Sequence, residues 1–140
     1  MAATLDQADE HALLAAARAA RAQAYAPYSK FQVGAALLDE HGRVHAGCNL
    51  ENAAYPQGQC AEAGALAALV LAGGRQARAL VVAGPGPAWA TPCGGCRQKL
   101  REFGSEDMPV LVADMAQVQA RFSLGELLPH AFGPPTLGPR

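Results

Sequence analysis

Cys60-Ala61-Glu62 and Pro92-Cys93-Gly94-Gly95-Cys96 are the two stretches from which the fold and the chemistry of this chain are interpreted. Three thiols that converge on one metal, with a carboxylate two residues after the first thiol, are typical of a catalytic zinc site, because zinc catalysis needs three protein ligands and one open position for water. Each stretch is also expected to begin a helix. The two helix N-termini would then meet at one point, where their dipoles favour anionic sulfur.

The Cys93-x-x-Cys96 spacing has several interpretations when it is taken alone. A structural zinc knuckle and a redox dithiol use the same spacing, and both remain alternatives at this point. A structural site, however, normally has a fourth cysteine or histidine in a second short motif, and either alternative leaves Glu62 unexplained. The remaining cysteine and the histidines lie outside any ligand spacing, so none is assigned to zinc: Cys48, His11, His41, His45 and His130.

The rest of the chain alternates between helical and strand-like patterns. An amphipathic, alanine-rich helix is expected to begin at Asp6, and the two cysteine-bearing helices follow it along the chain. The expected helices are 6–25, 60–71 and 93–103 with a short turn at 124–128, and the expected strands are 31–38, 43–48, 77–83, 110–112 and 118–122. This order predicts an α/β fold, a five-stranded mixed sheet with helices on both faces.

Length and composition indicate a single folded domain. With 140 residues the chain is long enough for one sizeable core and too short for two, so residues 1–140 are expected to form one domain, with roughly 133–140 as a flexible Pro/Gly-rich tail. Hydrophobic residues make up 51% of the chain and charged residues only 16%. So thin a polar surface suggests that another subunit covers part of it, and an oligomer is therefore expected.

Charge and hydropathy exclude several classes of partner. A formal net charge of -1 offers no basic field for a phosphate backbone, so no nucleic acid is expected as a partner and a small neutral substrate fits better. The first residues lack a basic region followed by an apolar run, and no apolar stretch is long enough to span a bilayer. The chain is expected to be cytoplasmic and not to bind a membrane.

Five stretches together resemble the small, zinc-dependent, homotetrameric cytidine deaminases, over nearly the whole chain from Tyr25 to Phe132. They are Tyr28-Ser29-Lys30-Phe31-x-Val33-Gly34-Ala35-Ala36, Gly47-Cys48-Asn49-x-Glu51-Asn52-Ala53, Cys60-Ala61-Glu62, Pro92-Cys93-Gly94-x-Cys96-Arg97-Gln98 and Glu126-Leu127-Leu128-Pro129. The resemblance implies an α/β/α sandwich. It also implies hydrolytic deamination of cytidine and 2′-deoxycytidine to uridine and 2′-deoxyuridine, with release of ammonia, in pyrimidine salvage.

The resemblance also assigns roles to individual residues of the site. Cys60, Cys93 and Cys96 would hold one zinc ion per chain, whose bound water has a pKa lowered towards neutrality. Glu62 would carry the proton from that water to the ring nitrogen and then to the departing ammonia. The commoner role for a glutamate at this position is only to complement the dipole of its helix.

Further residues match the substrate contacts of this family. Asn49 and Glu51 would hydrogen-bond the ribose 3′-hydroxyl, which suits one amide and one carboxylate on a loop. Phe31 would pack beside the pyrimidine ring, and the main chain at Ala61 would contact the base. Tyr55 is a further candidate for the same pocket, although a merely buried aromatic would explain it equally well.

The C-terminal part of the match concerns the assembly. A phenylalanine from a neighbouring subunit caps the base in this family, and Phe132 occupies that position. A homotetramer with active sites shared between subunits is therefore implied. The alternative is an aromatic side chain that packs against the core of its own subunit.

Two questions stay open in the sequence. A related deaminase could act on a nucleoside antibiotic or on a base within RNA, but the Asn49-x-Glu51 pair favours a free ribose and the low net charge disfavours a polynucleotide. Ala63 also stands where three-thiolate members of the family typically have an arginine that donates to the zinc-bound sulfurs. The hypothesis is that Arg97 and the amides of the two helix starts offset the thiolate charge, the alternative being that Arg97 is a surface or subunit-contact residue.

Overall fold

The structure is a computed structural model that describes residues 2–138, and its centre is one five-stranded sheet in the order β2-β1-β3-β4-β5. The pair β3–β4 is parallel and the other neighbouring pairs are antiparallel, so the sheet is mixed. The strands are β1 (Gly34–Asp39), β2 (Val44–Cys48), β3 (Ala77–Ala83), β4 (Pro109–Ala113) and β5 (Val118–Ser123). All six residues of β1 are buried, as expected for an apolar strand that is covered on both faces.

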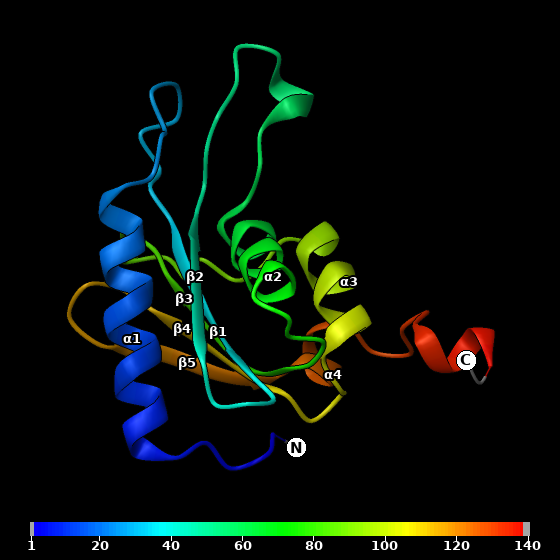
Figure 1. Ribbon diagram of the computed structural model, residues 1–140. Helices are drawn as coiled ribbons and strands as arrows, with labels where there is room; N and C mark the ends of the chain where they lie inside the picture. Colours follow the sequence, from blue (N-terminus) through cyan, green and yellow to red (C-terminus); the bar gives the residue numbers. More distant parts are fainter. Residues whose placement is uncertain (1, 139–140) are drawn as a thin grey trace.

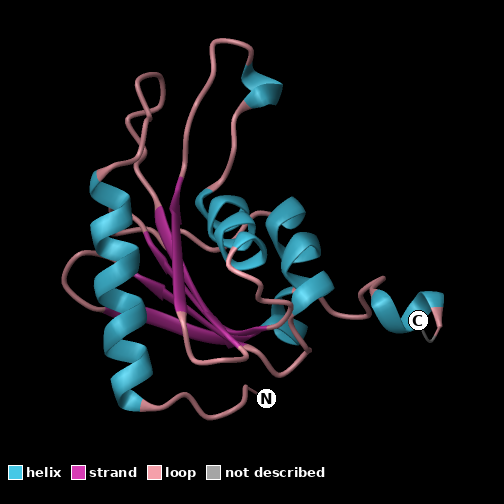
Figure 2. Cartoon of the chain, in the orientation of Figure 1, coloured by secondary structure: helices cyan, strands magenta, loops and turns pink. Residues whose placement is uncertain are grey.

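Helices cover both faces of the sheet, as Figures 1 and 2 show. The helix α1 lies on one face, and α2 and α3 lie on the other. The helical elements are α1 (Gln7–Ala22), α2 (Ala61–Leu71), α3 (Gly94–Phe103), α4 (Leu124–Leu127) and the 3-10 turns η1 (Tyr55–Gln57) and η2 (Pro134–Leu137). The predicted α/β fold, with its five-stranded mixed sheet and helices on both faces, is confirmed.

Alternation along the strands divides the core into two layers. Leu37 and Leu80 pack with the helices α2 and α3, whereas their neighbours Leu38 and Val81 pack with Leu13 of α1. Successive side chains of a strand point to opposite faces, so each central strand supplies both layers. The sheet is therefore buried between two helical layers.

Most element boundaries agree with the predicted ones to within one residue, and three differences need a physical explanation or a correction. The strand predicted for 31–38 begins only at Gly34, because the Asn49 side chain takes the hydrogen bonds of the preceding backbone: Val33 N donates to Asn49 Oδ1 at 2.8 Å, and Asn49 Nδ2 donates to Phe31 O at 2.8 Å. The first helix ends at Ala22, before the turn that carries Pro27. Within the tail the described residues form the 3-10 turn η2, where no regular structure was predicted, and residues 139–140 lie outside the described residues.

One end of the sheet collects the segments that matter for the site. Gly34 pairs with both Cys48 and Ala83, and Ala83 pairs with Ala113. The chain therefore enters β1 and leaves β2, β3 and β4 at this same end. Because α2 follows β2 and α3 follows β3, both helices begin here, and two long loops project beyond the sheet at the same end (Figure 1).

Gly47 allows α2 to lie directly on β2. A Cβ atom at this position would be 2.4 Å from Ala65 N and 2.5 Å from the Ala61 carbonyl oxygen, both on the helix backbone. Any side chain at position 47 would push the beginning of α2 away from the sheet. The position of the first cysteine stretch thus depends on a glycine in the strand beneath it.

Within residues 2–138, no helix combines the length and the apolar character needed to cross a bilayer.

The carboxylate of Asp39 fixes the turn between β1 and β2. It is fully buried and receives hydrogen bonds from the backbone amides of His41 and Arg43 at 2.8 and 2.9 Å and from Arg43 Nε at 2.7 Å, while His45 Nε2 lies 2.7 Å from it. Burial alone would raise the pKa of Asp39, but its interactions with His45, Arg43 and His41 together hold that pKa well below its usual range. The buried carboxylate is therefore ionised.

We expect Asp39→Asn to lower the free energy of unfolding at pH 7 by about 2 kcal/mol, because buried hydrogen bonds to a charged acceptor are weakened. A depressed pKa stabilises the fold above the unfolded-state value of about 3.9, and this contribution is lost as the pH falls towards the lower folded-state value. The difference between wild type and variant should thus shrink between pH 5 and about pH 3. Urea denaturation at a fixed protein concentration measures this difference in the free energy of unfolding.

The matched control is Glu106→Gln, which removes a carboxylate charge from an exposed side chain. The free energy of unfolding of Glu106→Gln should stay close to that of the wild type over the whole range from pH 7 to about pH 3. Equal losses in the two variants would contradict the assigned role of Asp39.

Candidate metal centre

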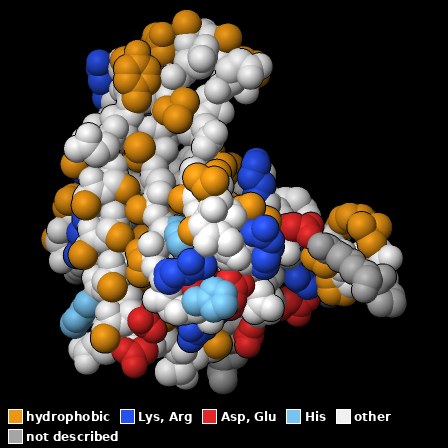
Figure 3. All heavy atoms as spheres, in the orientation of Figure 1, with side chains coloured by type: hydrophobic (Ala, Val, Ile, Leu, Met, Phe, Trp, Pro, Cys, Tyr) orange, Lys and Arg blue, Asp and Glu red, His pale blue; other side chains and the backbone are white. Residues whose placement is uncertain are grey.

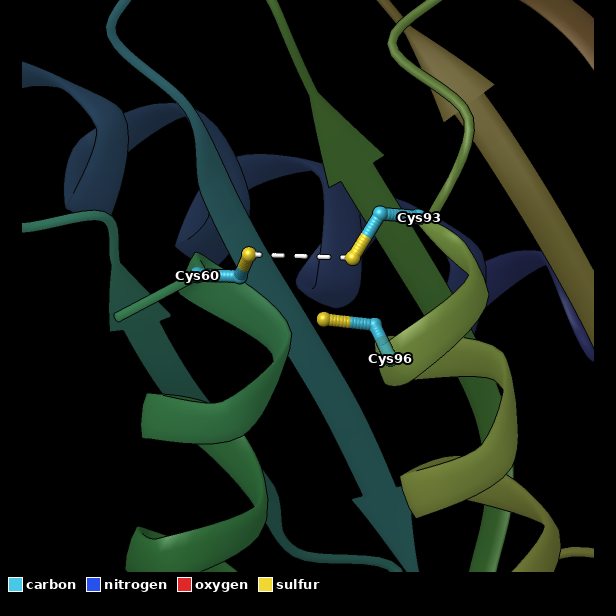
Figure 4. A group of neighbouring side chains, drawn as sticks. All are labelled: Cys60, Cys93 and Cys96. Atoms are coloured by element: carbon cyan, nitrogen blue, oxygen red, sulfur yellow. Dashed lines mark hydrogen bonds between the residues drawn. The ribbon is translucent and has the colours of Figure 1, made fainter. Parts of the chain in front are cut away.

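Three cysteine sulfurs converge where α2 and α3 begin. Cys60 and Cys93 are the N-cap residues of the two helices, with extended backbones, and Cys96 lies one turn into α3. The three Sγ atoms lie within 4.8 Å of one another, and those of Cys60 and Cys93 are 3.9 Å apart (Figure 4). Tetrahedral zinc with bonds of about 2.3 Å to sulfur requires neighbouring sulfurs about 3.8 Å apart. The predicted convergence of Cys60, Cys93 and Cys96 is therefore confirmed, with a spacing that suits zinc.

The electrostatics of this cluster favour a bound cation. Burial raises the pKa of the Cys60 and Cys96 thiols, and the negative charge of Glu62 raises both further. The Cys93 thiol differs, because the backbone amide of Cys96 lowers its pKa. Three thiolates this close repel one another unless a cation lies between them, and soft thiolate ligands select metals such as zinc. The donor set thus fits a zinc ion.

Glu62 lies in the first turn of α2 and is only 4% exposed. Burial raises the pKa of its carboxyl group, so that it holds a proton more readily than an ordinary glutamate. A carboxyl group of this kind, buried beside a metal site, is suited to taking up and releasing a proton.

A cavity of about 370 Å³ brings most of the predicted site together. Its lining includes six of the predicted residues: Phe31, Asn49, Cys60, Ala61, Glu62 and Cys93. Five further residues were not predicted and come from the ends of the central strands and the loop before α3: Val33, Val82, Trp89, Ala90 and Thr91. The sequence did contain a signal for Trp89, Ala90 and Thr91, since these residues directly precede the Pro92-Cys93 motif.

Asn49 is hydrogen-bonded to two other residues of the cavity lining. Its amide group holds the backbone at Phe31 and Val33, as described above, and so fixes the Phe31 side chain in the lining. One amide proton and one lone pair of Asn49 remain for a further partner.

Glu51 and Tyr55 line a different hollow, of about 410 Å³, between the two projecting loops. The Glu51 carboxylate accepts hydrogen bonds from the backbone amides of Tyr28 at 2.9 Å and Ser29 at 3.1 Å. The hydroxyl of Ser29, these two amides and the nearby Lys30 charge lower the pKa of Glu51, which is therefore ionised. The structure thus separates these two predicted residues from the thiols.

Phe132 does not line the cavity of its own chain. Its side chain is 58% exposed, and its carbonyl oxygen accepts a hydrogen bond from Gln98 Nε2 at 2.8 Å. The following Gly133 lies against Arg101, towards the end of α3 opposite to Cys93. The chain therefore passes α3 at residues 132–133, and the C-terminal segment then projects away from the rest of the molecule (Figure 1).

Arg97 directly follows the second cysteine stretch, and its side-chain hydrogen bonds go to carbonyl oxygens rather than to the sulfurs. Its guanidinium donates to the carbonyl oxygens of Pro92 at 2.7 Å and Leu127 at 2.8 Å. Among the described contacts, none joins Arg97 to a cysteine sulfur. The geometry thus gives Arg97 the role of holding the residue before Cys93 against the end of α4.

Comparisons with known proteins agree with this geometry. The family model for the cytidine and deoxycytidylate deaminase zinc-binding region matches residues 7–112. The chain is 44% identical over 124 residues to a cytidine deaminase of Sporosarcina psychrophila, covering 89% of this chain and 91% of that protein. It is 45% identical over 114 residues to one of Mycobacterium tuberculosis, covering 81% and 82%. A crystal structure of cytidine deaminase from Burkholderia pseudomallei superposes with a TM-score of 0.81 at 46% identity, covering 87% of this chain and 98% of that one.

We expect Cys93→Ala and Cys96→Ala to lose the bound metal, because two thiolates cannot replace three in holding it, and to lose stability with it. Cys48→Ala is the matched control, since Cys48 lies in β2 outside the cluster. Atomic absorption should find about one zinc per chain in the wild type and in the control, and far less in the other two variants. Full zinc content in all three variants would disprove the ligand set.

Proposed function

Because the chain belongs to the family of zinc-dependent cytidine and deoxycytidylate deaminases, we propose that it hydrolyses cytidine and 2′-deoxycytidine to uridine and 2′-deoxyuridine. One water molecule is consumed, the bond between C4 and the exocyclic nitrogen of the base breaks, and ammonia leaves. The observation that carries this proposal is one cavity whose lining includes a buried carboxyl group and two of the three convergent thiols.

The proposed mechanism assigns the proton transfers to Glu62. A zinc ion held by the three cysteines supplies the Lewis acid that makes water a nucleophile near neutral pH. Glu62 takes one proton from the attacking water and delivers it to N3 of the base. It then takes the second proton from the hydroxyl group formed on C4 and delivers it to the exocyclic amino nitrogen, which leaves as ammonia while C4 becomes a carbonyl carbon. Its burial supports this role, because a raised pKa brings a carboxyl group closer to the pH at which it must both accept and donate.

Substrate binding is assigned to groups on both sides of the cavity. Phe31 supplies an apolar surface for the pyrimidine ring, and the main chain at Ala61 supplies polar groups for its edge. Asn49, with its remaining amide proton, and the ionised Glu51 are proposed to bind the ribose 3′-hydroxyl, which cytidine and 2′-deoxycytidine share. Tyr55 is proposed to border the sugar from the neighbouring hollow.

We further propose that the chain acts as a single-domain protein in a homotetramer, with Phe132 completing the cavity of a neighbour. Large apolar side chains are exposed on the two projecting loops: Tyr25, Tyr28, Phe31, Leu50 and Tyr55. Figure 3 shows the hydrophobic groups gathered on these loops. Exposed apolar side chains gathered in this way suit a subunit contact. Pyrimidine salvage in the cytoplasm is the corresponding role in the cell.

We expect Glu62→Gln to retain one zinc per chain but to lose about 10⁴-fold in kcat, because glutamine cannot carry a proton. The assay follows the loss of cytidine absorbance together with ammonia release. Glu106→Gln, which removes an exposed carboxylate outside the cavity, should match the wild type. Near-normal turnover by Glu62→Gln would disprove its assignment as the proton carrier.

We expect Phe132→Ala to raise the KM for cytidine about tenfold while zinc content stays unchanged, because an apolar cap over the base is lost. Leu137→Ala is the control within the same tail, where the side chain is 77% exposed. Light scattering should give a mass of four 14.4 kDa chains for the active protein. An active monomer would refute the shared site, and an unchanged KM would refute the capping role.

A further inference from the structure

Trp89 contributes a large aromatic surface to the cavity that contains the thiols. It is the only tryptophan of the chain, lies four residues before Cys93, and lines the cavity together with Phe31 and Glu62. Its side chain is 56% exposed, although other contacts hold the loop to which it belongs. Nothing in the zinc site or in the proton transfers described above uses this side chain.

The loop from β3 to α3 holds Trp89 in one position. The Trp89 ring packs edge-on against Phe122 of β5, with ring centroids 5.9 Å apart and an angle of 66° between the ring planes. Gln119 Nε2 donates to Pro87 O at 2.9 Å, which ties the loop to the same strand. Ala90 folds back over Gly84, where an added Cβ atom would lie only 2.6 Å from the Ala90 Cβ atom. The last two contacts hold the loop, and the edge contact with Phe122 orients the ring within the cavity wall.

The proposed reaction fixes how a pyrimidine must lie in this cavity. C4, the carbon that water attacks, has to face the sulfurs, and N3 has to face Glu62 on α2, because Glu62 protonates it. In the ring C5 lies on the side of C4 opposite to N3, so the C5–C6 edge turns away from α2. The part of the lining that belongs neither to the start of α2 nor to the two projecting loops comes from the end of β3, the loop before α3 and Cys93, and Trp89 is its largest member.

We infer that Trp89 faces the C5–C6 edge of the bound base and limits the size of the substituent at C5, an inference that rests on the proposed cytidine deaminase function. An indole oriented in this way leaves room for hydrogen at C5 and disfavours a methyl group there. Steric discrimination of one carbon atom is usually worth a factor of about 10 to 200 in kcat/KM. Trp89 is therefore the specificity-determining residue for C5-substituted cytidines.

The test compares kcat/KM for cytidine and 5-methylcytidine in the wild type, Trp89→Phe and Trp89→Ala, each loaded with zinc. We expect the wild-type preference for cytidine to fall about tenfold or more in Trp89→Ala, with Trp89→Phe between the two. Zinc content and melting temperature are measured alongside. The ratio of the two substrates is the decisive readout, since a loosened loop would slow both substrates equally.

Met115→Ala is the matched control, because Met115 is 50% exposed and lies outside the cavity lining; its ratio should equal that of the wild type. An unchanged ratio of kcat/KM for cytidine and 5-methylcytidine in both Trp89 variants, with or without a higher KM for cytidine, would overturn the inference about Trp89 but not the proposed function. Failure of the zinc-loaded wild type to release ammonia from either nucleoside would overturn the proposed function as well.

Discussion

The convergence of three cysteine sulfurs within 4.8 Å is the constraint on which the rest of the structure depends. Two of these sulfurs belong to the N-cap residues of α2 and α3, so the two helices have to begin side by side at the same end of the sheet. The sheet satisfies this because β2 and β3 both end there, each followed by one of the helices. Gly47 brings α2 close enough to β2 for the sulfurs to meet. The geometry of the metal site is therefore set by backbone packing rather than by flexible side chains.

The cavity above the sulfurs depends on a second, polar constraint. Asn49 bonds to the backbone at Phe31 and Val33, and Glu51 bonds to the amides of the turn at Tyr28 and Ser29. Both projecting loops are thereby held to each other through side chains that also have capacity for a substrate hydroxyl. Asn49 and Glu51 thus hold the two loops together and are also the residues proposed to bind the substrate. A substitution of either residue would change the loop structure and substrate binding together.

The sequence predicted those features that depend on local patterns, and it missed those that depend on distant partners. The strand Ala77–Ala83 was predicted with its observed bounds, because an apolar run between turn residues is a local signal, and the three cysteines were predicted from spacing at helix starts. The segment before Gly34 was misassigned to a strand because its hydrogen-bond partner, Asn49, lies in another loop. The cavity role of Trp89 depends on Phe122 in β5, and the partners of Arg97 are carbonyl groups, which leave no signature in a sequence.

The charge of the three thiolates links the packing of the two helices to the chemistry of the metal site. Zinc with three thiolates carries a formal charge of -1, which weakens the metal as a Lewis acid unless positive charge or dipoles offset it. Ala63 has no charged group and lines a hollow between α2 and α3, and the Arg97 side chain donates to carbonyl oxygens. What does act on the sulfurs is the backbone, since the amide of Cys96 lowers the pKa of the Cys93 thiol and both helix dipoles favour negative charge at their N-termini. Because these dipoles belong to the same two helix starts that set the sulfur positions, any shift of α2 relative to α3 changes the geometry and the charge balance of the site together.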